Sequence, residues 1–424
     1  MAGHAVARTF GSLVAAQGLG AGFGFLFWVL AARTVPVEGV AAAGAAIAAM
    51  LLISTLANLG TGMLLMTELA GVPEAERRRL IQHALLGAAG VSAVLAVGFT
   101  LVSPSYGESF GHAFADPRNV ALFVLGTVAT TVGVVMDRAV LGLRSPGSQT
   151  LRNLIAVTAR FPVVAGLVLL GVRDATALLT AWVAALIIAQ CVQLRRLRLP
   201  KATSRFSWNR MRADVGRYFP KAITHHALNL SLGLAPQAMP LLAAAVLVPS
   251  SFASFNIAWT MCGFLFVVPY AMAVTLLAVS STDGGDVPGR IRVTLRSGLT
   301  LALLGALGAL LLGGFVLRAY GAGYVRDGTL LLQLLAAATV PLVVKDHYFV
   351  IQRLRDRRGR AAGIATGCVL VELSGALCGS MLAGATGLAV GWLIALTAEA
   401  GLMLPPVLAA IRSSGSRSEP RPGN

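Results

Sequence analysis

Apolar runs of about 20 residues, the length a helix needs to cross a membrane, recur from one end of this 424-residue chain to the other. Lipid offers no hydrogen-bond partner to backbone amides and carbonyls, so a spanning segment must be a helix or part of a closed barrel. A barrel would show alternating segments of about ten residues. These runs are continuous and rich in Ala, Leu, Val and Gly, so the sequence predicts an all-α polytopic membrane protein.

The charge content supports this class. Charged residues make up 12% of the chain, about half of what soluble domains carry. About twelve transmembrane helices are expected, at residues 11–33, 38–68, 80–103, 119–143, 150–171, 175–194, 218–247, 250–279, 297–318, 329–352, 361–383 and 386–411. The second and eighth runs are longer than a bilayer requires, so we expect them to tilt or to extend beyond it.

The net charge of +17 raises the question of a nucleic-acid partner. The basic residues instead alternate in density from loop to loop, as the positive-inside rule requires. The basic-rich set consists of Arg8, Arg77–Arg79, Arg144, Arg152, residues 195–221, Arg290, Arg292, Arg296, residues 353–360 and the C-terminal arginines. The opposite set holds only Arg33, Arg118, Arg173, Arg318 and Arg326. We therefore expect cytoplasmic termini, no nucleic-acid partner, and attraction of the basic loops to anionic lipid headgroups.

The loop around residues 195–221 is the longest and most polar, and it divides the spans into two sets of six. We expect an N-terminal lobe at 1–200, a linker at 201–216, a C-terminal lobe at 217–411 and a disordered tail at 412–424. Because six is even, both lobes enter the membrane in the same orientation. Any repeat would be parallel, with a pseudo-twofold axis along the membrane normal.

Short matches between the halves indicate such a repeat. Asp137 precedes Arg144 by seven residues, and Asp346 precedes Arg353 by the same interval. Each pair closes the fourth span of its lobe and opens the fifth.

Two further pairs lie at matching places. Arg160 follows Gly147 by thirteen residues, Glu372 follows Gly359 by thirteen, and Trp182 and Trp392 fall in the sixth spans. The shared order favours a duplicated six-helix bundle.

Ionisable residues inside spans are costly and usually face a bundle interior or a watery cavity. Arg160 and Glu372 lie near mid-span and could meet near the pseudo-twofold axis. One interpretation is an anion-binding arginine whose strength Glu372 modulates. The alternative is a buried ion pair that only fixes packing.

Other charges lie closer to the cytoplasmic ends, or in span twelve. Asp137, Arg138, Lys345 and Asp346 could couple transport, or could be structural ion pairs and snorkelling side chains. Glu399 in span twelve could titrate in a coupling step or hydrogen-bond a neighbouring helix.

Polar side chains also mark a predicted cavity lining, namely Gln17, Asn58, His226, Asn229 and Asn256. Span seven carries Pro220, Pro236 and Pro240, which makes it the best candidate for a gating helix. His225-His226 lacks a partner at metal spacing, the cysteines are scattered, and no Walker A motif or nucleophile–base set is present. We expect no metal, no cofactor and no enzymatic activity.

Several short motifs resemble a known family. They are Leu30–Gly39 (LAARTVPVEG), Asn58-Leu59-Gly60, Arg217–Pro220 (RYFP) and Gly384–Trp392 (GATGLAVGW). Together they make the chain similar to Wzx-type polysaccharide flippases of the multidrug/oligosaccharidyl-lipid/polysaccharide (MOP) exporter superfamily.

The resemblance implies two six-helix lobes around a cavity lined by spans one, two, seven and eight, working by alternating access. It implies a bacterial cytoplasmic membrane and a lipid-linked saccharide substrate, typically on undecaprenyl diphosphate, flipped to the outer leaflet. Glycosyltransferases or a polymerase of a glycan assembly pathway are expected partners. The four cavity spans contain no mid-membrane Arg or Lys, which departs from the family's cationic cavity. A drug/cation antiporter of the superfamily and a non-transporting scaffold for glycan assembly remain alternatives.

Overall fold

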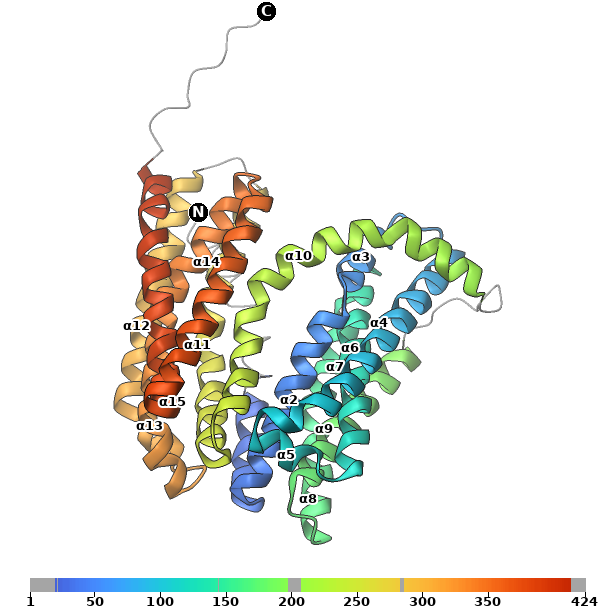
Figure 1. Ribbon diagram of the computed structural model, residues 1–424. Helices are drawn as coiled ribbons and strands as arrows, with labels where there is room; N and C mark the ends of the chain where they lie inside the picture. The colour runs from blue at the N-terminus through green and yellow to red at the C-terminus, as the bar shows by residue number, and fades with distance from the viewer. Residues whose placement is uncertain (1–19, 21, 144, 197–206, 283–285, 413–424) are drawn as a thin grey trace, which may run out of the picture. The chain divides into compact units, whose positions relative to one another are not determined.

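The computed structural model describes residues 20, 22–143, 145–196, 207–282 and 286–412 (Figure 1). Throughout these ranges the chain forms helices joined by short turns, without a strand. Contacts divide it into two compact units, and the boundary between them in the sequence falls within one helix, between Asn256 and Ile257. We call Phe23–Asn256 the N-terminal unit and the described residues from Ile257 onward the C-terminal unit.

The helices of the N-terminal unit follow a short apolar helix at Gly22–Thr34. They are α2 (Val37–Ala57), α3 (Thr61–Glu68), α4 (Glu74–Val102), η1 (Ser103–Tyr106), α5 (Glu108–Phe114), α6 (Pro117–Gly142), α7 (Pro146–Thr158), α8 (Arg160–Leu169), α9 (Ala175–Arg196) and α10 (Trp208–Val246). The C-terminal unit contains most of α11 (Pro249–Thr282), with α12 (Val287–Leu317), α13 (Ala322–Ala337), α14 (Thr339–Leu354) and α15 (Arg358–Arg412).

The helices agree with the predicted spans. Nine helices within the described ranges are long and apolar enough to cross a membrane. Two shorter apolar helices, Gly22–Thr34 and Gly233–Val246, coincide with the first and seventh predicted spans. The last long helix, α15, contains both the eleventh and the twelfth. Every predicted span therefore has a helical counterpart, and the all-α polytopic class is confirmed.

The long run at 38–68, which we expected to tilt or to extend beyond the bilayer, consists of two helices, α2 and α3. Leu59 has φ 45° and Gly60 has φ 77°, and these left-handed residues end α2 and redirect the chain into α3. The Asn58 Oδ1 atom accepts hydrogen bonds from Gly62 N (2.9 Å) and Thr61 Oγ1 (3.2 Å). The bond from Gly62 satisfies an amide donor that the first turn of α3 would otherwise leave without a partner. The other long run is one continuous helix, α11.

Helix α15 folds back on itself at Ala383 and Gly384, where the backbone leaves the helical region. Its two arms approach so closely that a Cβ atom at Gly391 would collide with the Gly375 carbonyl oxygen. Gly379 and Gly387 meet in the same way. Each arm thus presents a Gly-xxx-Gly face, the spacing that lets membrane helices pack backbone to backbone.

Helix α2 is the most buried span of the N-terminal unit, and it contacts α4, α5, α6, α9 and α10. Its Ala-rich middle, residues 41–49, lets these neighbours approach. By sequence, α10 opens the second lobe, yet it packs on α2, α3 and α5. It runs through its three prolines without a break and curves along its length (Figure 1). The lobe boundaries at 201–216 stay a prediction, because contacts within one unit do not define a repeat.

Two basic residues assigned to loops, Arg152 and Arg290, are buried inside helices. Arg152, assigned to a cytoplasmic loop, lies inside α7 with only 8% of its surface exposed. Its charge has a buried partner, so it does not report topology.

Candidate functional site

A cluster of three charged side chains lies inside the C-terminal unit. Lys345 on α14 reaches between Glu372 on the first arm of α15 and Glu399 on the second. Its Nζ donates a short hydrogen bond to Glu372 Oε1 and one of 2.8 Å to Glu399 Oε2. The side chains are 12%, 2% and 7% exposed, so the cluster is nearly cut off from solvent.

Aromatic rings close one side of this cluster. Trp392 Nε1 donates a 2.7 Å hydrogen bond to Glu372 Oε2, so both oxygens of that carboxylate have donors. The Trp392 ring lies 5.0 Å from the Trp259 ring and 5.9 Å from the Phe266 ring, both on α11. The close packing of the two α15 arms brings Trp392 within reach of Glu372.

The cluster holds more negative than positive groups. Lys345 serves two carboxylates, and the adjacent Asp346 interacts electrostatically with both Lys345 and Arg353. Glu399 Oε1 has no hydrogen-bond partner there either, although the Cys368 thiol lies next to this carboxylate. An unbalanced negative charge is expensive inside a membrane. The arrangement could therefore take up a proton.

The N-terminal unit holds a charge with a different environment. Arg160 opens α8 and is 7% exposed. Its guanidinium carbon lies 3.4 Å from the ring centroid of Trp182 on α9 and 5.7 Å from that of Phe27. Such cation–π contacts stabilise a desolvated arginine by about 2 kcal/mol. Its Nε has no hydrogen-bond partner, and no carboxylate pairs with it across the described ranges.

The two sites agree with the repeat alignment. Arg160 and Glu372, predicted to be equivalent, each contact the tryptophan predicted to be equivalent in the sixth span, Trp182 or Trp392. The Arg160 guanidinium lies on the face of the Trp182 indole, whereas the Glu372 carboxylate accepts a hydrogen bond from the Trp392 indole N–H. Their contacts lie within their own units, so the direct Arg160–Glu372 pair stays a prediction.

Asp137 on α6 forms a second buried ion pair in the N-terminal unit. Arg152 Nη2 donates a 2.6 Å hydrogen bond to its Oδ2, and Gln193 Nε2 on α9 lies 3.5 Å from its Oδ1. This pair joins the fourth, fifth and sixth spans, as Lys345 joins the corresponding spans of the C-terminal unit. A structural role for Asp137 is the simpler interpretation.

The remaining predicted residues are dispersed. Asn58 caps α3, exposed Arg138 packs over Gly62, and the Asn256 amide lies against Gly44. Gln17 lies outside the described residues, and so do the side chains of His226 and Asn229. The predicted cavity lining therefore stays a prediction.

Sequence reasoning missed several contributors. Arg152 was grouped with the loops, and Trp259 and Phe266 carried no charge to draw notice. His347 was not singled out from the sequence, although its Nε2 lies 3.1 Å from Thr294 Oγ1 and joins α14 to α12. In the portion of the chain that is described, no group of three or more His, Cys, Asp or Glu side chains could hold a metal ion.

Comparisons with known proteins address the fold. The lipid II flippase MurJ in an inward closed conformation is 14% identical, with a TM-score of 0.67, covering 94% of this chain and 89% of that one. An inward-facing multidrug resistance MATE transporter of the MOP superfamily is 12% identical, with a TM-score of 0.62 and coverage of 93% and 96%. A MOP superfamily transporter from Pyrococcus furiosus is 13% identical, with a TM-score of 0.56 and coverage of 96% of each chain. No curated protein matches the sequence.

These likenesses show a shared fold and confirm the predicted class, a polytopic helical protein with about twelve transmembrane helices in two six-helix lobes. A family model described as "Polysaccharide biosynthesis protein" matches residues 6–276, well over half of the chain. The chain therefore belongs to this polysaccharide biosynthesis family and has the fold of the MOP-superfamily transporters.

Proposed function

We propose that the protein is a secondary transporter that flips a lipid-linked saccharide for cell-surface polysaccharide biosynthesis. It would carry the saccharide, attached to undecaprenyl diphosphate, from the cytoplasmic to the outer leaflet by alternating access. The observation that carries this proposal is membership of a polysaccharide biosynthesis family together with the fold of a lipid II flippase. The protein would reside in a bacterial cytoplasmic membrane, with both termini in the cytoplasm and glycan-assembly enzymes as neighbours.

Arg160 supports an anionic substrate group. It is a cation inside a span, held by aromatic rings rather than neutralised by a carboxylate within the described part of the chain. A diphosphate offers several acceptor oxygens, and arginine binds such groups by paired, charge-assisted hydrogen bonds.

Flipping can be measured directly. The purified protein is reconstituted in liposomes that carry a fluorescent lipid-diphosphate sugar, and a membrane-impermeant quencher reports the outer-leaflet fraction over time. We expect wild-type flipping above protein-free liposomes, a loss of at least tenfold for Arg160→Gln, and partial activity for Arg160→Lys. Arg118→Gln, which removes an exposed charge outside the predicted sites, is the matched control. Absence of wild-type flipping with several lipid-linked sugars would sink the proposal.

The acid-rich cluster around Lys345 favours a second candidate, a proton-coupled drug/cation antiporter with the same fold. In that case everted vesicles would take up a cationic dye when their lumen is acidified. Glu372→Gln or Glu399→Gln would abolish this uptake. A flippase would show no dye uptake, whether as wild type or as one of these variants. A non-transporting scaffold would show neither activity.

A further inference from the structure

The first three turns of α10, Trp208–Tyr218, form an amphipathic segment that continues into the seventh span. Its inward residues are Met211, Asp214 and Tyr218, which follow helical spacing. Trp208, Arg210, Arg212 and Arg217 lie exposed around the rest of the helix circumference. We call these four residues the basic face.

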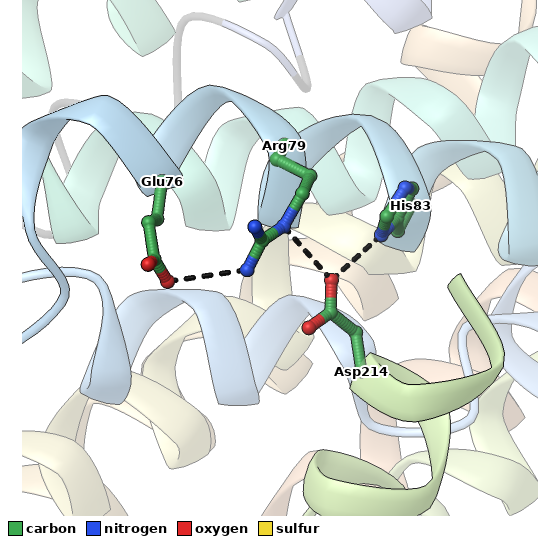
Figure 2. Close-up of polar contacts among 4 residues, drawn as sticks. All are labelled: Glu76, Arg79, His83 and Asp214. Carbon is green, nitrogen blue, oxygen red and sulfur yellow. Dashed lines mark hydrogen bonds and ion pairs between the residues drawn. The ribbon is translucent and has the colours of Figure 1, made fainter. Parts of the chain in front are cut away.

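The inward side is fastened to α4 by an ionic contact (Figure 2). Asp214 Oδ2 lies 2.7 Å from His83 Nδ1 and 3.4 Å from Arg79 Nε. Arg79 also donates to Glu76 Oε2 at 3.1 Å. His83 and Asp214 are 5% and 13% exposed, so this contact is largely shielded from water.

Apolar contacts flank the ionic one. The Met211 methyl group lies beside Gly87 on α4, and Tyr218 packs against the core that α3, α4 and α6 share. The segment is thus held at three successive inward positions, and its rotation about its own axis is fixed.

His83 also marks the depth of the segment. The preceding turns of α4 carry Glu74, Glu76 and Arg77–Arg79, and no Asp, Glu, Lys or Arg follows before Val102. His83 therefore lies where α4 passes from a polar environment into the membrane. Because Asp214 is bound to it, the segment lies at the level of the lipid headgroups.

The basic face has the composition of a membrane–water interface. Trp208 is 55% exposed, and the Arg212 guanidinium carbon lies 5.7 Å from its ring centroid. The only acidic residue of the segment, Asp214, points inward, so the outward charges are all positive. Tryptophan and arginine together are typical of helices that lie along anionic membrane surfaces.

We propose that the basic face binds the headgroups of anionic phospholipids, and that the Asp214–His83 contact holds it in the orientation this binding requires. A soluble acidic protein is disfavoured as the partner, because the face lies at headgroup depth and the exposed indole suits the interface. The proposal does not depend on the flippase activity.

Trp208 supplies an intrinsic probe. The full-length protein is reconstituted in vesicles of phosphatidylcholine and phosphatidylglycerol in which one lipid or the other is brominated near its headgroup. Bromine quenches nearby indoles, and the difference between wild type and Trp208→Phe isolates Trp208 among the five tryptophans. We expect Trp208 to be quenched more by brominated phosphatidylglycerol than by brominated phosphatidylcholine at equal bromine content.

Variants separate this face from general positive charge. The triple variant Arg210→Gln/Arg212→Gln/Arg217→Gln should lower the apparent affinity for phosphatidylglycerol by roughly tenfold or more. Arg118→Gln/Arg173→Gln, which removes exposed charge from the opposite set of loops, should leave it unchanged. Asp214→Asn should weaken the preference although every arginine remains. Equal quenching by the two lipids in wild type, or an unchanged preference in the triple variant, would overturn the proposal and favour a protein partner.

Discussion

The Trp392 indole donates its hydrogen bond to Glu372 across the break in α15, over 2.7 Å and twenty residues of sequence. The other Glu372 oxygen accepts from Lys345 on α14. One carboxylate therefore ties together three helical segments of the C-terminal unit.

Lys345→Met tests the cluster. The variant leaves Glu372 and Glu399 buried without their cation, and removing one partner of a buried pair typically costs about 3–5 kcal/mol. We expect a clearly lower melting temperature in detergent, followed by tryptophan fluorescence.

The triple variant Lys345→Met/Glu372→Gln/Glu399→Gln provides the control, because neutral amides remove most of the electrostatic cost. It should recover much of the lost stability. Equal melting temperatures for Lys345→Met and wild type would show that the cluster does not hold the helices together.

The α15 hairpin predicts a position-dependent glycine effect. Gly391→Ala places a methyl group against the Gly375 carbonyl and should destabilise the protein by about 1–3 kcal/mol. Gly401→Ala in the same helix meets open space and should be neutral or stabilising by up to about 1 kcal/mol. Thermal unfolding of the two variants tests this difference. Similar shifts in their melting temperatures would argue against close packing of the arms.

A double-mutant cycle between Arg160 and Trp182 measures their contact. The 3.4 Å approach of the guanidinium carbon to the indole centroid should give a coupling energy of about 1–2 kcal/mol in stability. Arg160→Gln, Trp182→Leu and the double variant complete the cycle. Additive effects would mean that the ring only fills space.

Asn58 should act through the start of α3. Asn58→Ala removes the acceptor of the Gly62 N–H and should cost about 1 kcal/mol. Asn58→Asp keeps an acceptor and should cost less. Amide hydrogen exchange at residues 61–64 would report the difference, and equal protection in both variants would exclude a capping role.

Much of the fold follows from the sequence, because spans are set by length and hydropathy within single segments. The break at Leu59 and Gly60 was missed, although Gly60 beside the polar Asn58 marks a position where a left-handed conformation costs little. The turn at Ala383 and Gly384 was located correctly, because Gly384 separates two runs that are each long enough to span.

The candidate site was found only in part. The high free-energy cost of placing an ionised side chain inside a membrane identified the residues of interest, which are Arg160, Glu372, Lys345 and Glu399. Their partners depend on how each helix is rotated toward its neighbours, which composition does not reveal. Glu372 thus has Lys345 and Trp392 as partners. Arg152 is a buried ion-pair partner of Asp137 rather than a loop residue.

Helix α10 covers α2, α3 and α5, although the predicted repeat assigns it to the second half of the chain. If the chain arose by duplication of a six-helix ancestor, one copy of that ancestor would lack the helix that completes this unit. It would have to receive that helix from a second copy, as subunits do when they exchange segments. Gene fusion would then have converted an exchange between subunits into an arrangement within one polypeptide, which makes an obligate homodimer the expected precursor.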